Sequence, residues 1–218
     1  MSAETNYYSR PEVSNSDLTA LKELLHPRGS FGDREAAFRL GSIVDAMVTE
    51  PWRVDFLSGT IDGKPVGNDE FERGRAMQRA LRAEARRDAF LANVLAVSDT
   101  QKCMFRHDQI FDNGGFQFTL DTRCKWDWWL ECAGFGGDLK TTAASSQREF
   151  EEAVDYFDWD RSRAWYMDIA GSDRDFIYAI SKKNFQIFKL FIERDSELYR
   201  RGREKYLDLA FKYWAFAL

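Results

Sequence analysis

Apolar residues recur every three or four positions in several segments of the chain, which is the spacing of one face of an α-helix. The segments with this pattern are 16–25, 35–49, 71–95, 145–156, 161–171 and 195–217. Ser16 or Asn15 is expected to cap the first helix, and Pro27 follows its end. The last segment is predicted to be a long amphipathic helix whose apolar side either completes the core or lies between subunits.

The helix predicted over 35–49 contains one acid within an apolar run. Its buried side is expected to consist of Phe38, Ile43, Val44 and Met47. Asp45 lies among these residues. A carboxylate there either faces solvent or has a cationic partner, because burying it alone is costly. The apolar spacing leaves both interpretations open.

Short stretches rich in β-branched and aromatic residues lie between the helical segments and predict strands. They cover 109–111, 117–120, 125–129, 137–142, 175–181 and 185–190. Two turns, 112–115 and 132–137, contain glycines that permit positive φ, and they predict hairpins. Strands bracketed by helices predict an α/β (α+β) fold with a mixed central β-sheet flanked by helices. No linker divides the chain, so residues 1–218 are expected to form a single domain.

The second predicted hairpin carries two acids and a lysine. Residues two apart on a strand share a face, so Asp138 and Lys140 are expected to project together while Leu139 points into the core. The hairpin would also carry Asp127 toward Asp138. Clustered carboxylates repel one another unless a hard divalent cation such as Mg²⁺ lies between them. The pattern therefore predicts a metal site.

The charge pattern bears on whether the chain binds nucleic acid. The formal net charge of −5 disfavours it, since phosphate binding depends on clustered Lys and Arg. One local exception is a basic stripe at helical spacing that consists of Arg75, Arg79, Arg82 and Arg86. This stripe either contacts DNA or is a solvated helix face with Glu72 and Glu84 as partners.

Several classes of protein are disfavoured by features that the sequence lacks. Three cysteines without a CxxC pair argue against a disulfide framework, a zinc site and an iron-sulfur cluster. Neither His26 nor His107 has a nucleophile motif nearby, and the 134–137 glycines are not followed by the Lys-Ser/Thr of a nucleotide-binding loop. Residues 1–4 lack the layout of a signal peptide, and no apolar run could span a bilayer. A cytoplasmic protein without membrane contact is expected.

The pattern Asp127 followed by Asp138-Leu139-Lys140 resembles the PD-(D/E)XK nuclease superfamily, in which a β-hairpin presents an acid and then acid-x-lysine. Further segments resemble, in the same order, RecE-like phage exonucleases of the RecB and lambda exonuclease branch. These segments are 7–18, 38–47, 138–142, 164–168 and 180–202. The resemblance covers most of the chain.

The resemblance implies a set of metal ligands. The branch commonly has a histidine ligand within Gly-x-x-x-His, and here Gly41 keeps the spacing while Asp45 replaces the histidine. A carboxylate there favours Mg²⁺ or Mn²⁺ over softer metals. The implied ligands are Asp45, Asp127, Asp138 and the carbonyl of Leu139. The implied catalytic residues are Asp127, Asp138 and Lys140, with the lysine orienting the attacking water.

The branch also has a Gln-x-x-x-Tyr motif, which Ser162 and Tyr166 match without the glutamine. Arg161 or Arg163 is expected to bind phosphate instead. Tyr166 either contacts the substrate or packs in the core. Three tryptophans that flank the site either pack in the core or stack on a base, namely Trp126, Trp128 and Trp129.

The function that the resemblance implies is a magnesium-dependent exonuclease that hydrolyses phosphodiester bonds of double-stranded DNA, in phage-type recombination or repair. One alternative is an endonuclease of the same fold. Another is a catalytically inactive DNA-binding or assembly module. The implied partners are DNA, a single-strand annealing protein and further copies of the chain in a homo-oligomer.

Overall fold

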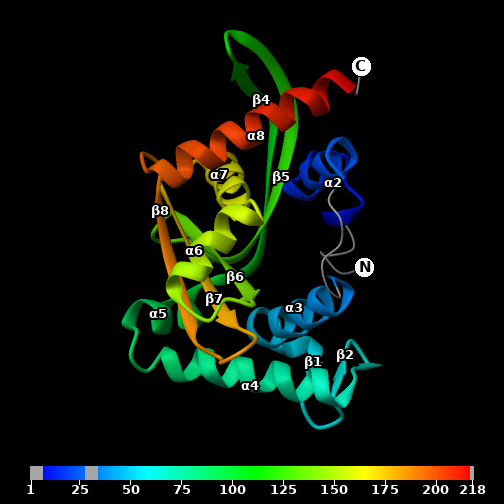
Figure 1. Ribbon diagram of the computed structural model, residues 1–218, viewed down its shortest axis with the longest axis vertical. Coiled ribbons are helices and arrows are strands. Elements are labelled where there is room, and N and C mark those ends of the chain that lie inside the picture. The colour runs from blue at the N-terminus through cyan, green and yellow to red at the C-terminus, as the bar shows by residue number, and fades with distance from the viewer. Residues whose placement is uncertain (1–6, 28–33, 217–218) are drawn as a thin grey trace.

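The computed structural model describes residues 7–27 and 34–216, arranged as a central sheet between two groups of helices (Figure 1). The helices are α2 (Asn15–Leu25), α3 (Arg34–Thr49), η1 (Pro51–Arg53), α4 (Asn68–Glu84), α5 (Ala89–Val97), α6 (Gln147–Tyr156), α7 (Trp159–Ala170) and α8 (Glu197–Phe216). The strands of the central sheet are β4 (Asp99–Asn113), β5 (Phe116–Leu130), β6 (Phe135–Thr142), β7 (Arg174–Ser181) and β8 (Ile187–Glu193). Position 217, the predicted end of the last helix, and residues 1–4 lie outside the described residues.

The five strands form one sheet in the order β4-β5-β6-β7-β8. Strands β6 and β7 run parallel, with α6 and α7 between them in the chain, and the other neighbouring pairs are antiparallel. The prediction of a mixed central sheet flanked by helices is therefore confirmed. A second, small sheet of β1 (Val54–Asp55), β2 (Thr60–Ile61) and β3 (Lys64–Pro65) was not predicted, because two-residue strands leave no periodic pattern.

Strands β4 and β5 form a long hairpin that reaches along α8 (Figure 1). Its turn is the predicted one, with Gly114 and Gly115 both at positive φ. The two short predicted strands are the outer ends of two 15-residue strands. Exposed polar residues around His107 interrupt the apolar alternation, and this is why the sequence pattern shows only the ends.

Strands β5 and β6 pair over only three residues, from Leu130↔Phe135 to Trp128↔Gly137. Beyond Gly137 the two strands separate, while β6 stays paired with β7 as far as Thr142. Glycine is needed where β5 and β6 still pair, since a Cβ on Gly136 would lie 2.4 Å from the backbone carbonyl oxygen of Trp128. The separation leaves a fork between β5 and β6.

Each face of the sheet carries its own hydrophobic core. On one face, helices α7 and α8 bury a cluster that includes Trp165, Ile177 and Tyr206. On the other, α3, α4 and α5 bury a cluster that includes Val44 and Leu139, as expected for Leu139. The C-terminal helix thus completes the core, which is one of its two predicted roles. The flanking tryptophans are also core residues, namely Trp126, Trp128 and Trp129, so none of them is exposed for base stacking.

Three predicted details of the helices are wrong. The segment 71–95 is two helices rather than one, because Asp88 caps the start of α5 by accepting hydrogen bonds from the N–H groups of Phe90 and Leu91. The first helix is capped by Ser14, in a capping box with Asp17, and not by Asn15 or Ser16. Phe38, predicted to be buried on α3, is 66% exposed.

None of the helices in the described part of the chain combines the length and the apolar character that crossing a membrane requires.

Candidate active site

Asp138 and Lys140 project from β6 into the fork and form an ion pair. The Lys140 Nζ lies 2.5 Å from Asp138 Oδ2. Asp138 is buried and Lys140 is partly exposed, while Leu139 between them points into the core of the opposite face. The alternation of a β-strand therefore places the carboxylate and the amine together, as the sequence predicts.

Asp127 reaches across the fork from β5. Its Oδ2 accepts a hydrogen bond of 2.7 Å from the backbone N–H of Leu139. Backbone pairing between the two strands has already ended at Gly137, so this carboxylate takes the place of a backbone carbonyl as acceptor. Asp127 is thereby fixed beside the Asp138–Lys140 pair.

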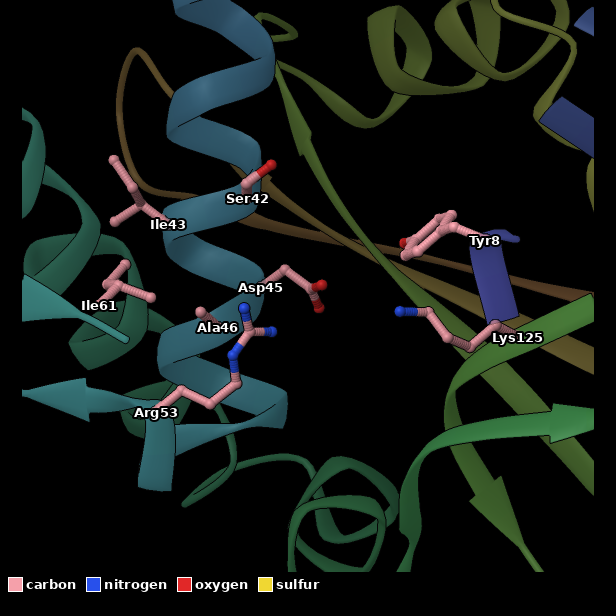
Figure 2. Close-up of a pocket in the computed structure, with 8 residues that line it drawn as sticks. All are labelled: Tyr8, Ser42, Ile43, Asp45, Ala46, Arg53, Ile61 and Lys125. Atoms are coloured by element: carbon pink, nitrogen blue, oxygen red, sulfur yellow. The ribbon is translucent and has the colours of Figure 1, made fainter. Parts of the chain in front are cut away.

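Asp45 approaches the same region from α3. Its carboxylate accepts hydrogen bonds from the Thr49 hydroxyl, at 3.0 Å, and from the Gln101 amide, at 3.3 Å. It lines a pocket of about 260 Å³. Figure 2 shows the Asp45 carboxylate pointing across this pocket toward Lys125 on β5 and Tyr8. The exposed-helix interpretation of Asp45 is therefore wrong.

The three carboxylates interact electrostatically. Burial and the neighbouring Asp45 and Asp138 raise the pKa of Asp127 well above its usual value. Burial also raises the pKa of Asp45, although Thr49, Lys125 and Lys140 partly offset it. Burial alone would raise the pKa of Asp138 too, but Arg163 and Lys140 hold it below the usual value. One carboxylate is thus held ionised beside another that resists ionisation.

The donors of this cluster suit a hard divalent cation, because carboxylate oxygens are the ligands that Mg²⁺ and Mn²⁺ prefer. Besides burial, repulsion from Asp45 and Asp138 raises the pKa of Asp127, and a bound cation would relieve that repulsion. Asp138 Oδ2 is buried and has the Lys140 amine as its ion-pair partner. Across 7–27 and 34–216, no three His, Cys, Asp or Glu side chains already stand close enough to hold one ion.

Arg163 and Asp175 lie behind Asp138 on the α7 side of the sheet. The Arg163 Nη1 is 3.5 Å from Asp138 Oδ1 and 3.8 Å from Asp175 Oδ2. Burial raises the pKa of Asp175 well above its usual value, despite the nearby guanidinium. The Arg163 side chain is only 1% exposed, which leaves it no surface from which to bind a phosphate, contrary to the prediction.

Arg161 is also buried, on the side of α7 that faces α2. It donates hydrogen bonds to the Asn15 side chain and the Thr19 hydroxyl, and it lies 4.0 Å from Asp158. These contacts anchor α2 and hold the Arg161 guanidinium away from the surface, contrary to its predicted role as a phosphate ligand. Tyr166 packs its ring against Trp126 and lies under the Arg163 guanidinium, as its core-packing interpretation expects.

The predicted basic stripe is on the surface, but it belongs to one helix only in part. Arg75, Arg79 and Arg82 lie on α4, whereas Arg86 follows the end of that helix. Arg75 donates a hydrogen bond to Glu72, as the solvated-face interpretation expects. Arg79, Arg82 and Arg86 are exposed. Contact of this stripe with DNA stays a prediction.

Sequence reasoning missed several residues around the acids. Lys125 and Arg53 line the Asp45 pocket, and Gln101 bonds the Asp45 carboxylate. The sequence signal that could have pointed to Asp175 is its position as an acid at the start of an apolar strand. Lys125, Arg53 and Gln101 carry no sequence signal of their own, because segments distant in the chain bring them together.

Comparisons with known proteins give distant structural likenesses. No protein-family model matches the chain, and no curated protein matches it. A crystal structure described as a phage related exonuclease from Haemophilus somnus 129PT aligns with a TM-score of 0.41 at 15% identity, covering 96% of each chain. The structure of LHK-Exo in complex with dAMP aligns with a TM-score of 0.36 at 14% identity, covering 94% of this chain and 88% of that one. Likenesses with TM-scores below 0.5 do not establish what this chain does.

Proposed function

We propose that this chain is a metal-dependent nuclease that hydrolyses phosphodiester bonds of DNA. One observation carries the proposal: the Asp138–Lys140 ion pair lies in a strand fork into which Asp127 also reaches. The motif resemblance to PD-(D/E)XK nucleases supports the same assignment. Neither the hydrophobic cores nor the strand pairing requires two acids and a lysine at this place. Burying clustered carboxylates costs folding free energy, and such clusters are typical of functional sites.

The proposed metal ligands are Asp127 and Asp138, with Asp45 and the carbonyl of Leu139 as further donors. The contact that Leu139 makes with the acids in this structure is through its N–H. A bound Mg²⁺ or Mn²⁺ would lower the pKa of a bound water and neutralise charge on the phosphate.

The protein's own groups have separate roles in this mechanism. Lys140, partly exposed beside Asp138, orients the attacking water and offsets the negative charge that develops at phosphorus. Asp127 is fixed by the Leu139 N–H, so its orientation does not depend on the substrate. Lys125 brings a positive charge to the adjoining pocket that would attract the phosphate backbone, whereas Arg53 in the same pocket is already paired with Glu50 and Asp62.

The substrate we propose is double-stranded DNA degraded from an end, in phage-type recombination or repair. A single-strand annealing protein and further copies of the chain are the proposed partners. These finer statements rest on the motif resemblance alone.

One assay tests the proposal. Purified protein is incubated with Mg²⁺ or Mn²⁺ and either end-labelled linear duplex DNA or covalently closed circular DNA. Release of nucleotides from linear DNA, with circles left intact, supports an exonuclease. Cutting of circles would instead show an endonuclease, and binding of DNA without any cleavage would show an inactive binding module.

A further inference from the structure

Arg163 occupies an unusual place between two acids on one face of the sheet. Asp138 is opposite Ile177 in the β6–β7 register, and Asp175 lies two residues before Ile177, so both carboxylates project from the same face. Helix α7 covers this face and directs Arg163 at both of them. Its Nη1 lies 3.5 Å from Asp138 Oδ1 and 3.8 Å from Asp175 Oδ2.

The guanidinium is fixed in this place. Its centre lies 4.0 Å from the centroid of the Tyr166 ring and 5.3 Å from that of the Trp126 ring. The Arg163 side chain is 1% exposed and that of Asp175 is 0% exposed. An arginine stays charged in proteins, so Arg163 is a permanent buried cation beside one of the proposed metal ligands.

The same position would suit a second metal ion. Two-metal nuclease sites hold their ions roughly 3.5–4 Å apart, with each ion bound by carboxylate oxygens. Asp138 and Asp175 would offer oxygens to such an ion on the α7 side. Arg163 Nη1 already lies between these two carboxylates, and its charge would repel a divalent cation brought there.

We propose that Arg163 is a positioning residue that acts as a fixed counter-ion between Asp138 and Asp175 and takes the place of a second divalent cation, so that the site holds one ion. The inference rests on the proposed function, because it concerns the metal content of that site. It also gives the fully buried Asp175 a cationic partner beside the site.

The test counts Mn²⁺ ions bound by the wild-type protein in the absence of DNA. Free Mn²⁺ is measured by electron paramagnetic resonance as the ion is titrated into the protein. One bound ion per chain at saturation is expected. Two ions would overturn the inference and leave the proposed nuclease intact. No bound ion, together with no cleavage, would overturn the proposed function and the inference with it.

Three variants test whether the count depends on Arg163. Arg163→Met removes the charge, and a second Mn²⁺ is expected to bind because Asp138 and Asp175 lose their fixed counter-ion. Arg163→Lys keeps a charge and is expected to bind one ion. The matched control is Arg161→Met, which alters a buried arginine of the same helix that pairs with Asp158 away from the site, and it is expected to bind one ion.

Circular dichroism and thermal unfolding establish that each variant is folded. A folded Arg163→Met protein that binds Mn²⁺ with the wild-type count would show that Arg163 is merely structural and would overturn the inference. A second ion bound by Arg163→Lys would also contradict it. If Arg163→Met does not fold, a count of two ions in the wild type or in Arg163→Lys would still overturn the inference.

Discussion

The carboxylate of Asp138 is held by two cations of different character. Arg163 is buried and permanently charged, whereas Lys140 is partly exposed and reaches the fork where a substrate could approach. The pKa of Asp138 is lowered by both. Only Lys140 is therefore placed to act on a water or phosphate, and it is the residue whose loss should separate catalysis from stability.

Lys140→Ala is expected to lower the rate of DNA cleavage by roughly 10²- to 10³-fold, the effect typical of removing one group that stabilises transition-state charge. The fold should persist, because Arg163 still pairs with Asp138. The measurement is the single-turnover cleavage rate together with thermal unfolding. Lys189→Ala is the control, since Lys189 also pairs with an aspartate, Asp88, but on a different part of the sheet. Equal rates for both variants would refute a catalytic role for Lys140.

Asp127→Asn is expected to stabilise the metal-free protein at pH 8. The pKa of Asp127 is raised in the folded state by burial and by Asp45 and Asp138, so wild-type stability falls as pH rises above the usual aspartate range. The amide keeps an acceptor for the Leu139 N–H and cannot ionise. Thermal unfolding in EDTA from pH 4 to pH 8 should show a stability gap that widens with pH. A variant less stable than wild type at pH 8 would contradict the raised pKa of Asp127 in the folded protein.

The residue pattern of the site was predictable where it depends on a single strand. Asp138 and Lys140 share a face because of the two-residue period of β6. Arg163 was visible as a cation near the site, but its burial depends on how α7 lies across β6 and β7. Helix packing of this kind leaves no periodic signal in the sequence. Arg163 was therefore predicted to bind phosphate, whereas the structure places it as a buried counter-ion.

At the scale of elements, α7 and α8 pack so closely that one crossing point admits only glycine. A Cβ added to Gly202 on α8 would lie 2.3 Å from the backbone carbonyl oxygen of Asp160. Backbone atoms cannot move aside as a flexible side chain can, so the helices would have to separate.

Gly202→Ala is therefore expected to destabilise the protein by about 2 kcal/mol or more. Overpacking a core typically costs about 1–3 kcal/mol and occasionally more. Gly41→Ala on α3 is the matched helical control, since the nearest atom to its added Cβ is Thr141 Oγ1 at an ordinary 3.5 Å. Alanine has the higher helix propensity, so this control should be neutral or more stable by up to about 1 kcal/mol. Chemical denaturation measures both. Similar stability changes in the two variants would refute the close packing.

The existence and order of the main elements followed from periodicity, but their limits did not. The break between α4 and α5 depends on Asp88, whose carboxylate also accepts a hydrogen bond from the Tyr178 hydroxyl and pairs with Lys189. These partners come from β7 and β8, and local propensity cannot reveal them. The lengths of β4 and β5 were likewise set by their pairing with each other.

At the scale of the whole molecule, the charge is unevenly placed. The chain has a formal net charge of −5, yet Arg79, Arg82 and Arg86 are exposed together along α4 and just beyond its end. An acidic protein that binds DNA would bind it through such a local surface, with the remainder repelling the phosphate backbone.

A double charge reversal, Arg79→Glu with Arg82→Glu, is expected to weaken DNA binding and to reduce its dependence on salt. Each lost phosphate contact should lower the slope of log affinity against log salt by about 0.9. Fluorescence anisotropy with Ca²⁺ in place of Mg²⁺ measures binding at several salt concentrations. An unchanged slope would show that this surface is only a solvated helix face, the other interpretation of the stripe.

The proposed nuclease requires that Asp127, Asp138 and Lys140 form one site that acts through a divalent cation. The most direct measurement is the rate of linear duplex DNA cleavage as Mg²⁺ is titrated, for the wild-type protein and Asp138→Asn. We expect no cleavage in EDTA, a rate that rises to saturation with Mg²⁺ in the wild type, and loss of that activity in a folded Asp138→Asn protein. Cleavage that persists in EDTA, or that is unaffected by Asp138→Asn, would contradict it.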